Sequence, residues 1–252
     1  MFNRIAVAAA LLTVTTAAGF AQTSIERERA RPHYRAGEEY LRIEAWKEAA
    51  TSFQQAIAID PQFEVAYYGL GRAQMALKQF PEAIESYTKC RDLYRAEGGR
   101  RFTSQQEARR HWQDRLMEVD DVLRQYQQGA QPQQTDRTSQ RIRQLQELRR
   151  DLQERLTRSL NLTIDSKVPA FVSLALGSAY FRSAKLADAE REYKAAIDVD
   201  PQAGEAHSNL AVVYMETGRL ADAERAVAAA EKTGFKVHPQ LKADIRARKN
   251  GS

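Results

Sequence analysis

The residues that could carry catalytic or metal-binding chemistry are scarce, because the chain of 252 residues has 4 histidines and 1 cysteine. A zinc site needs several His, Cys or carboxylate ligands at short spacings, and a cysteine nucleophile needs a histidine partner. No histidine has such a neighbour, and the sequence has neither a phosphate-binding loop nor a nucleophile elbow. We therefore predict no catalytic residue, no metal site, no cofactor and no enzymatic activity. The histidines are His33, His111, His207 and His238.

Arginine is concentrated between residues 98 and 169, and an arginine-rich segment is one feature of nucleic-acid-binding proteins. The acids of this segment are spaced to pair with the arginines along a helix, as in Asp151 with Arg155 and Glu154 with Arg158. The whole chain carries a net charge of +5 with 33 acidic residues, so bases and acids are interleaved. This pattern favours a solvated helical surface, and we expect no nucleic-acid partner.

The elements that would position any site repeat along the chain. Small, aromatic and proline residues recur with a period of about 34 residues, which is typical of a helical repeat array. Apolar residues within a period follow one face of a helix, as in Ala49, Phe53 and Ala56. The recurring positions are Gly37, Tyr40, Ala49, Phe53, Ala56 and Pro61; Leu70, Gly71, Ala83, Tyr87 and Cys90; Leu176, Gly177, Tyr180, Ala189, Tyr193, Ala196 and Pro201; and Leu210, Tyr214, Gly218, Ala223 and Ala230.

The single cysteine, Cys90, fits this repeat. It excludes an intramolecular disulfide and any site with several cysteines. Other periods have Ala56, Ala196 or Ala230 at the same position. We interpret Cys90 as a small buried hydrophobic residue at a tight helix contact.

The repeated positions resemble the tetratricopeptide repeat family, with units that start at Ala30, Glu64, Ala170 and Gly204. The resemblance implies antiparallel helix pairs that stack into an α-solenoid. It also implies protein binding on the concave face, which the first helix of each unit lines. The departures from the family pattern are Gln74 for an aromatic residue, Arg95 and Phe235 for proline, Ala211 for glycine and Val227 for an aromatic residue.

The groove residues implied by the resemblance are aromatic and aliphatic with a few charges, which suits a helix or an extended peptide with apolar anchors. The lysines and asparagines with which some family members clamp a terminal carboxylate are absent. Phe171, Leu174 and Phe181 face either an open groove or the segment inserted before them. The predicted groove residues are Tyr34, Glu38, Leu41, Tyr68, Arg72, Met75, Phe171, Leu174, Ser178, Phe181, Ser208 and Val212.

The inserted residues 98–169 lack the repeat signature. A capping box at residues 104–107 starts a helix over residues 105–128, and a second helix follows a polar loop at about residues 140–160. Apolar residues spaced four and three apart predict an antiparallel hairpin with a heptad-like seam, whose tip we expect to project beyond the solenoid. A decayed pair of repeats is the alternative. The seam residues are Trp112, Leu116, Val119, Leu123, Ile142, Leu145, Leu148 and Leu152.

Residues 1–21 are typical of an export signal, because Arg4 precedes an apolar run and small residues lead to Ala21. The run is too short and too rich in alanine to favour a membrane span. We predict cleavage after Ala21, a periplasmic or secreted protein, and no stable membrane anchor after cleavage.

The sequence thus predicts an all-α fold, namely an α-solenoid of two repeat pairs separated by a long antiparallel helical hairpin and closed by a C-terminal capping helix. The predicted function is a non-enzymatic scaffold in the bacterial envelope that binds a peptide or helix of another protein through its concave face. The alternative is a structural assembly subunit that self-associates through the hairpin. The predicted domains are a signal peptide at 1–21, repeats at 22–97, the hairpin at 98–169, repeats at 170–237, and the capping helix and tail at 238–252.

Overall fold

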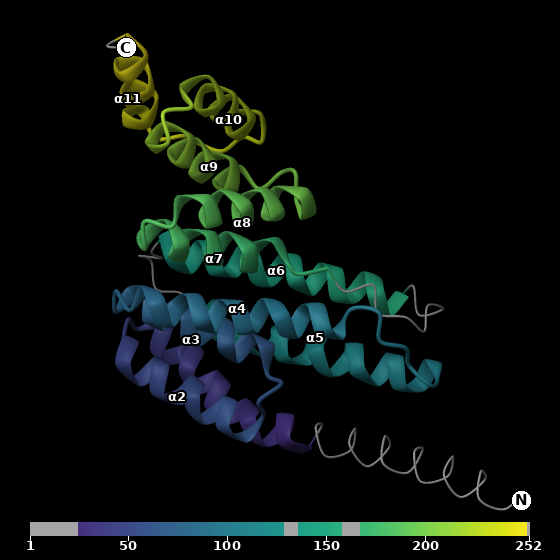
Figure 1. The fold of residues 1–252 in the computed structure, drawn as a ribbon. Coiled ribbons are helices and arrows are strands. Elements are labelled where there is room, and N and C mark those ends of the chain that lie inside the picture. Colours follow the sequence, from purple (N-terminus) through teal and green to yellow (C-terminus); the bar gives the residue numbers. More distant parts are fainter. Residues whose placement is uncertain (1–24, 129–135, 158–166, 251–252) are drawn as a thin grey trace, which may run out of the picture.

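The computed structural model describes residues 25–128, 136–157 and 167–250, and the regular elements in these ranges are helices (Figure 1). The expected signal and its cleavage point lie outside the described residues. The all-α class is confirmed. The helices are residues 25–42, α2 (Trp46–Ile59), α3 (Glu64–Ala76), α4 (Phe80–Glu97), α5 (Gln105–Gln128), α6 (Asp136–Thr157), α7 (Ala170–Arg182), α8 (Leu186–Val199), α9 (Gly204–Glu216), α10 (Leu220–Lys232) and α11 (Pro239–Asn250).

Eight of these helices form four helix pairs, which we number as units one to four and which begin at Ala30, Glu64, Ala170 and Gly204. In units one to three the two helices approach closely because the first helix carries a glycine where the second carries an aromatic ring. A Cβ atom on Gly71 would lie 2.5 Å from the Tyr87 ring, and one on Gly177 would lie 2.8 Å from the Tyr193 ring. Any larger residue at these glycines would push the helices apart.

The turn inside each unit uses one residue in the left-handed region. Glu44, Lys78 and Ala184 have φ values of 61°, 61° and 58°, and Gly218 has the equivalent place in unit four with φ 74°. Only glycine adopts this conformation without a steric cost. The first three units therefore hold a strained residue at this turn.

The four units form one uninterrupted stack. The hairpin separates units two and three along the sequence, but in space α7 packs directly on α4. Arg91 on α4 donates to Glu192 on α8 at 2.8 Å, and the rings of Tyr68 and Phe171 meet edge to face with centroids 4.9 Å apart. Figure 1 shows the repeat helices layered in the order α2, α3, α4, α7, α8, α9 and α10. The insertion is therefore looped out of the array rather than set between its halves.

The inserted helices α5 and α6 pair with each other in antiparallel orientation. Arg155 lies over the Trp112 ring near one end of the pair, and Arg149 lies 2.8 Å from Asp120 further along. The backbone N–H of Glu107 donates to Ser104 Oγ at 3.1 Å, as the capping-box motif predicts. The predicted boundaries of α5 are confirmed and α6 begins earlier than expected, whereas residues 158–160 of its predicted C-terminal end lie outside the described residues.

The C-terminal helix α11 closes the stack. Leu241 and Ile245 are buried against unit four, and Arg248 donates to the Met215 carbonyl at 3.0 Å. This arrangement confirms the predicted capping helix. Cys90 is free and fully buried, as interpreted from the repeat. Within the described residues, every helix is too short or too polar to cross a membrane.

Candidate functional site: the concave face and the hairpin that fills part of it

The ends of α5 and α6 nearest the hairpin tip pack on the concave face, and the expected projection of the tip beyond the solenoid stays a prediction. Tyr126 at the end of α5 and Arg141 near the start of α6 both contact Glu38, which lies on the helix at residues 25–42. The connecting loop itself lies outside the described residues. The physical reason for this packing is that the concave positions of units one and two carry large and charged side chains, which the hairpin complements.

Glu38 is the centre of this contact and is completely buried. Its carboxylate accepts hydrogen bonds from Tyr126 Oη at 2.9 Å, from Arg72 Nη1 at 3.0 Å and from Arg141 Nη2. Tyr34 Oη lies 3.3 Å from the same carboxylate. A buried carboxylate is stable only when charges and donors replace its water, and this one has both.

The pKa of Glu38 reflects the balance between its burial and its positively charged partners. Burial disfavours its charged form, but the positive charges of Arg141 and Arg72 outweigh burial and lower the pKa to about 2. Burial raises the pKa of Tyr126 to about 12, and it also raises the pKa of Tyr68. Glu38 is therefore ionised and both phenols are neutral at pH 7.

A second group of charges joins the middle of α5 to units one and two. Arg31 donates to Glu118 at 3.1 Å, and Arg27 donates to Glu64 at 3.2 Å. Arg115 donates to Glu97 at 3.0 Å and also pairs with Glu64. These contacts hold α5 along the first helix of unit one.

Two features of this group stand out. The charged form of Glu118 is disfavoured, and the pair of His111 with Glu97 was not predicted from the sequence. Burial raises the pKa of Glu118 despite its arginine partners. His111 Nε2 lies 3.0 Å from Glu97 Oε1, and burial lowers the pKa of His111. The pKa of Glu97 is lowered to about 2, because Arg115 and His111 outweigh burial. Among the described residues, no three His, Cys, Asp or Glu side chains are placed to hold a metal ion.

The predicted seam lies inside this interface. Ile142, Leu116 and Leu148 are partly buried against the core, and the other seam residues are fully buried within it. A cavity of about 20 Å³ lies between α5, α6 and the first helices of units one to three, which is room for about one water molecule. The buried seam residues are Trp112, Val119, Leu123, Leu145 and Leu152.

The predicted groove residues fall into two sets. Tyr34, Leu41 and Tyr68 are 3–5% exposed, because they lie under the hairpin or in the adjoining core. Phe171 packs on Tyr68 and borders the small cavity beside Leu148, so it faces the hairpin side. The partly exposed set comprises Arg72, Met75, Phe171, Leu174, Ser178, Phe181, Ser208 and Val212.

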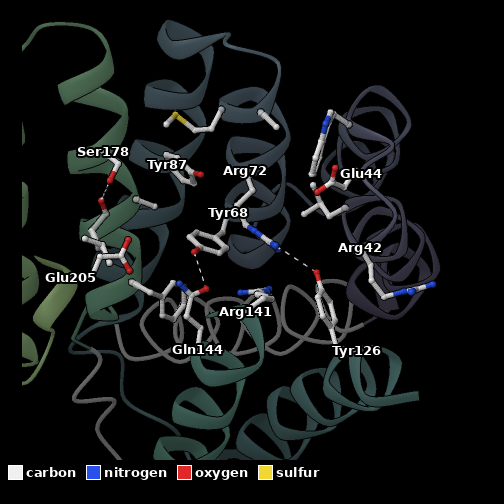
Figure 2. Close-up of a pocket in the computed structure, with 17 residues that line it drawn as sticks. Arg42, Glu44, Tyr68, Arg72, Tyr87, Tyr126, Arg141, Gln144, Ser178 and Glu205 are labelled. Atoms are coloured by element: carbon white, nitrogen blue, oxygen red, sulfur yellow. Dashed lines mark hydrogen bonds between the residues drawn. The ribbon is translucent and has the colours of Figure 1, made fainter. Parts of the chain in front are cut away.

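A larger cavity of about 330 Å³ lies on the concave face, between the adjoining ends of α5 and α6 and units one to three, with Glu205 of unit four at its edge. Figure 2 shows Arg72 and Arg141 side by side between Tyr68 and Tyr126, with Glu44 and Glu205 on opposite sides. Seven predicted groove residues border this cavity, namely the buried Leu41 and Tyr68 and five partly exposed residues. These five are Arg72, Met75, Phe171, Leu174 and Ser178.

Ser178 is the hydroxyl of the cavity wall that most resembles a nucleophile, and its contacts are structural. Its Oγ donates to the Leu174 carbonyl at 3.0 Å and lies 3.3 Å from Tyr193 Oη. A serine nucleophile needs a base within hydrogen-bond reach, and neither contact supplies one. Phe181, Ser208 and Val212 are partly buried and do not line this cavity.

Sequence reasoning missed the hairpin residues Arg141 and Gln144, and it placed Tyr126 in the heptad-like seam rather than in the site. Gln144 accepts from Tyr68 Oη at 3.2 Å, and Arg141 lies over the Tyr68 ring at 5.2 Å. A signal was present, because Arg141 stands four residues before Leu145 in the seam register. A charged residue in an apolar seam needs a buried partner, and Glu38 is the only acid among the predicted groove residues.

The fold and the site define a helical repeat protein with a partly filled concave face. Two family models described as tetratricopeptide repeat match residues 174–235 and 65–96, and a third described as TPR repeat matches residues 37–78. These matches support membership of the tetratricopeptide repeat family, whose members are in general non-enzymatic scaffolds for protein interaction. The matched ranges lie on either side of the hairpin.

Solved structures similar to the chain include PilW, described as a widely conserved type IV pilus biogenesis factor, at 16% identity and a TM-score of 0.38. The match covers 91% of this chain and 87% of PilW. A thermophilic TPR protein of Thermus thermophilus, TTC0263, is 20% identical over 87% of this chain and 98% of its own, with a TM-score of 0.30. YrrB, described as a TPR protein with an unusual peptide-binding site, is 16% identical over 86% and 91%, with a TM-score of 0.29. No curated protein matches the chain.

Proposed function

We propose that this protein is a scaffold of the bacterial envelope that holds a segment of a partner protein in the cavity between the adjoining ends of α5 and α6 and the repeat units. The observation that carries the proposal is the cavity itself, which lies on the concave face of a repeat array and has a volume of about 330 Å³. Protein pockets of this size take ligand groups of a few side chains.

The walls of the cavity suit a peptide. Met75, Leu174 and Phe171 supply apolar surface, and Gln144 and Ser178 supply polar groups beside them. Peptide recognition combines apolar anchor pockets with a few polar groups that fix orientation. The hairpin shortens the groove, so the bound segment is shorter than one that runs along the whole concave face.

The envelope location rests on the export-signal pattern of residues 1–21 and is part of the proposal. N-terminal sequencing of the protein purified from its native cells tests it. A mature chain that begins at Gln22 supports export, whereas a chain that retains residues 1–21 counts against cleavage after Ala21.

The partner is sought by placing a photoreactive amino acid at Met75 in the native cells, with the exposed Glu85 on α4 as the matched control position. The segment captured at Met75 and absent at Glu85 is then synthesised and its affinity measured by calorimetry. Ala175→Leu fills the cavity and should weaken binding at least about tenfold, whereas Ala187→Leu on the exposed face of α8 should leave it unchanged. Equal affinities for the two variants would remove the cavity from the binding site.

Self-association through the hairpin has less support, because the seam residues are already buried within one chain.

A further inference from the structure

The floor of the cavity holds two guanidinium groups that share one carboxylate. Arg72 and Arg141 both donate to Glu38, and both line the cavity. Tyr68 and Tyr126 beside them are neutral, so they supply hydrogen bonds without balancing the charge. Arg72, Arg141 and Glu38 together therefore carry one net positive charge, and Arg141 is buried.

The two arginines also have unused donor capacity. Arg141 is 4% exposed, and its buried Nε has no hydrogen-bond partner among the described residues. Arg72 Nη2 makes only a long contact of 3.5 Å with Tyr126 Oη. A water molecule in the neighbouring cavity of about 20 Å³ could accept one N–H, but water brings no negative charge.

The rest of the cavity limits what the ligand can be. Arg42 on the rim is paired with Glu39, whose Oε2 accepts from Arg42 Nε at 2.9 Å. Glu44 and Glu205 stand on opposite sides of the opening, so the rim repels a polyanion while the floor attracts a single anion. Met75 and Leu174 supply apolar surface beside the arginines.

We propose that Arg72 and Arg141 form a carboxylate subsite, which binds an acidic side chain of the partner segment while an apolar neighbour of that side chain packs on Met75 and Leu174. This inference rests on the proposed function and names the chemistry of its ligand. A planar guanidinium matches a carboxylate in geometry, and a charged hydrogen bond is strongest where water is excluded. The hairpin is then part of the binding site, because Arg141 comes from α6.

The test uses the intact protein and two probes, 3-phenylpropionate and its uncharged amide, 3-phenylpropionamide. Binding is followed by the ¹H–¹⁵N signal of Arg141 Nε, which is assigned by its loss in Arg141→Lys. We expect the carboxylate to bind at least about tenfold more tightly than the amide and to shift the Arg141 Nε signal. Equal binding of the two probes, or carboxylate binding that leaves this signal unmoved, would overturn the subsite.

Two variants sharpen the result. Arg141→Met should reduce carboxylate affinity to that of the amide, whereas Arg149→Met, on the same helix and paired with Asp120 at the surface, should leave it unchanged. Glu38→Gln removes the competing carboxylate and should tighten binding of the carboxylate probe about tenfold. If the two arginines have a purely structural role, the affinity for the probe should not increase. Circular dichroism melting confirms that each variant is folded. If the probes fail but a partner segment is still captured at Met75, the subsite is wrong and the proposed function stands.

Discussion

The two halves of the concave face differ in what they carry at equivalent positions of the repeat. Units one and two present Tyr34 with Glu38 and Tyr68 with Arg72, whereas units three and four present smaller pairs. Those pairs are Leu174 with Ser178 and Ser208 with Val212. The hairpin is held on the first half through buried charges, whereas Leu174 and Ser178 of the second half line the larger cavity. The residues at equivalent positions of one repeat frame therefore decide where the hairpin docks.

The buried charges of the first half give the largest expected effect. Arg141→Met leaves Glu38 buried with one arginine fewer, which should destabilise the docked hairpin by about 3–5 kcal/mol. Arg149→Met breaks an ion pair whose side chains are 44% and 33% exposed, and should cost at most about 1 kcal/mol. Native-state hydrogen exchange of α5 and α6 measures both. Similar losses in the two variants would mean that the Glu38 network does not hold the hairpin.

The second largest effect is expected at low pH, where the hairpin on the first half should lose stability before the second half does. The pKa of Glu38 is lowered from 4.5 to about 2, so its contribution to stability is complete above about pH 4.5 and is lost as the pH falls towards 2. The pKa shift of Glu38 corresponds to about 3 kcal/mol of folding stability. The lowered pKa of Glu97 makes stability depend on pH in the same direction, whereas the raised pKa of Glu118 has the opposite effect. We expect hydrogen-exchange protection of α5 and α6 to fall in this window before that of α9 and α10. In Glu38→Gln this pH dependence should be much weaker, and an unchanged profile in that variant would assign the acid sensitivity to other groups.

A tyrosine hydroxyl in each half offers a finer comparison. Tyr68→Phe removes a hydrogen bond of 3.2 Å to Gln144 on the hairpin and should weaken hairpin docking by about 1 kcal/mol. Tyr193→Phe removes the contact of 3.3 Å with Ser178 inside unit three and should leave the hairpin unaffected. Chemical denaturation together with hydrogen exchange at α6 separates the two effects. A loss of hairpin protection in Tyr193→Phe would show that the halves are energetically coupled.

The smallest effect lies where the halves are alike, at the turn inside each unit. Lys78→Gly in unit two and Ala184→Gly in unit three relieve a left-handed residue and should each stabilise the protein by about 0.5 kcal/mol. The reverse change, Gly218→Ala, should destabilise unit four by about 1 kcal/mol. Thermal melting measures all three. A destabilising Ala184→Gly would show that the side chain contributes more than its backbone strain costs.

The repeat helices and the cap were predictable from the sequence, because glycine opposite an aromatic ring and regular apolar spacing are local signals. Gly71 with Tyr87 is an example of the first signal. Leu241 with Ile245 on α11 is an example of the second. The place of the hairpin was not predictable in this way. Its seam predicts which faces of α5 and α6 pack together, but the contact of Arg141 with Glu38 joins residues 103 positions apart. Sequence spacing marks Arg141 as a charged residue within an apolar seam, but it does not show where Arg141 and Glu38 meet in space.

The same limit applies to the candidate site. Seven of the predicted groove residues border the larger cavity, because the repeat frame places them on the concave face. The frame cannot tell that Tyr34 is covered while Ser178 is not, since that depends on where the inserted helices lie. The direct packing of α7 on α4 could not be predicted from the sequence for the same reason.

The central claim, that the hairpin lies on the concave face of its own units one and two, is tested most directly by cross-linking. Gln125 Nε2 on α5 donates to the Arg35 carbonyl at 3.2 Å. Arg35→Cys and Gln125→Cys are combined with Cys90→Ala, which places the alanine of the other units at this buried position, and a short bis-maleimide is added. The pair Ser208→Cys with Gln125→Cys serves as the control. The account predicts rapid cross-linking within the monomer for the first pair only. Cross-linking that yields only covalent dimers, or no cross-link at all, would contradict it.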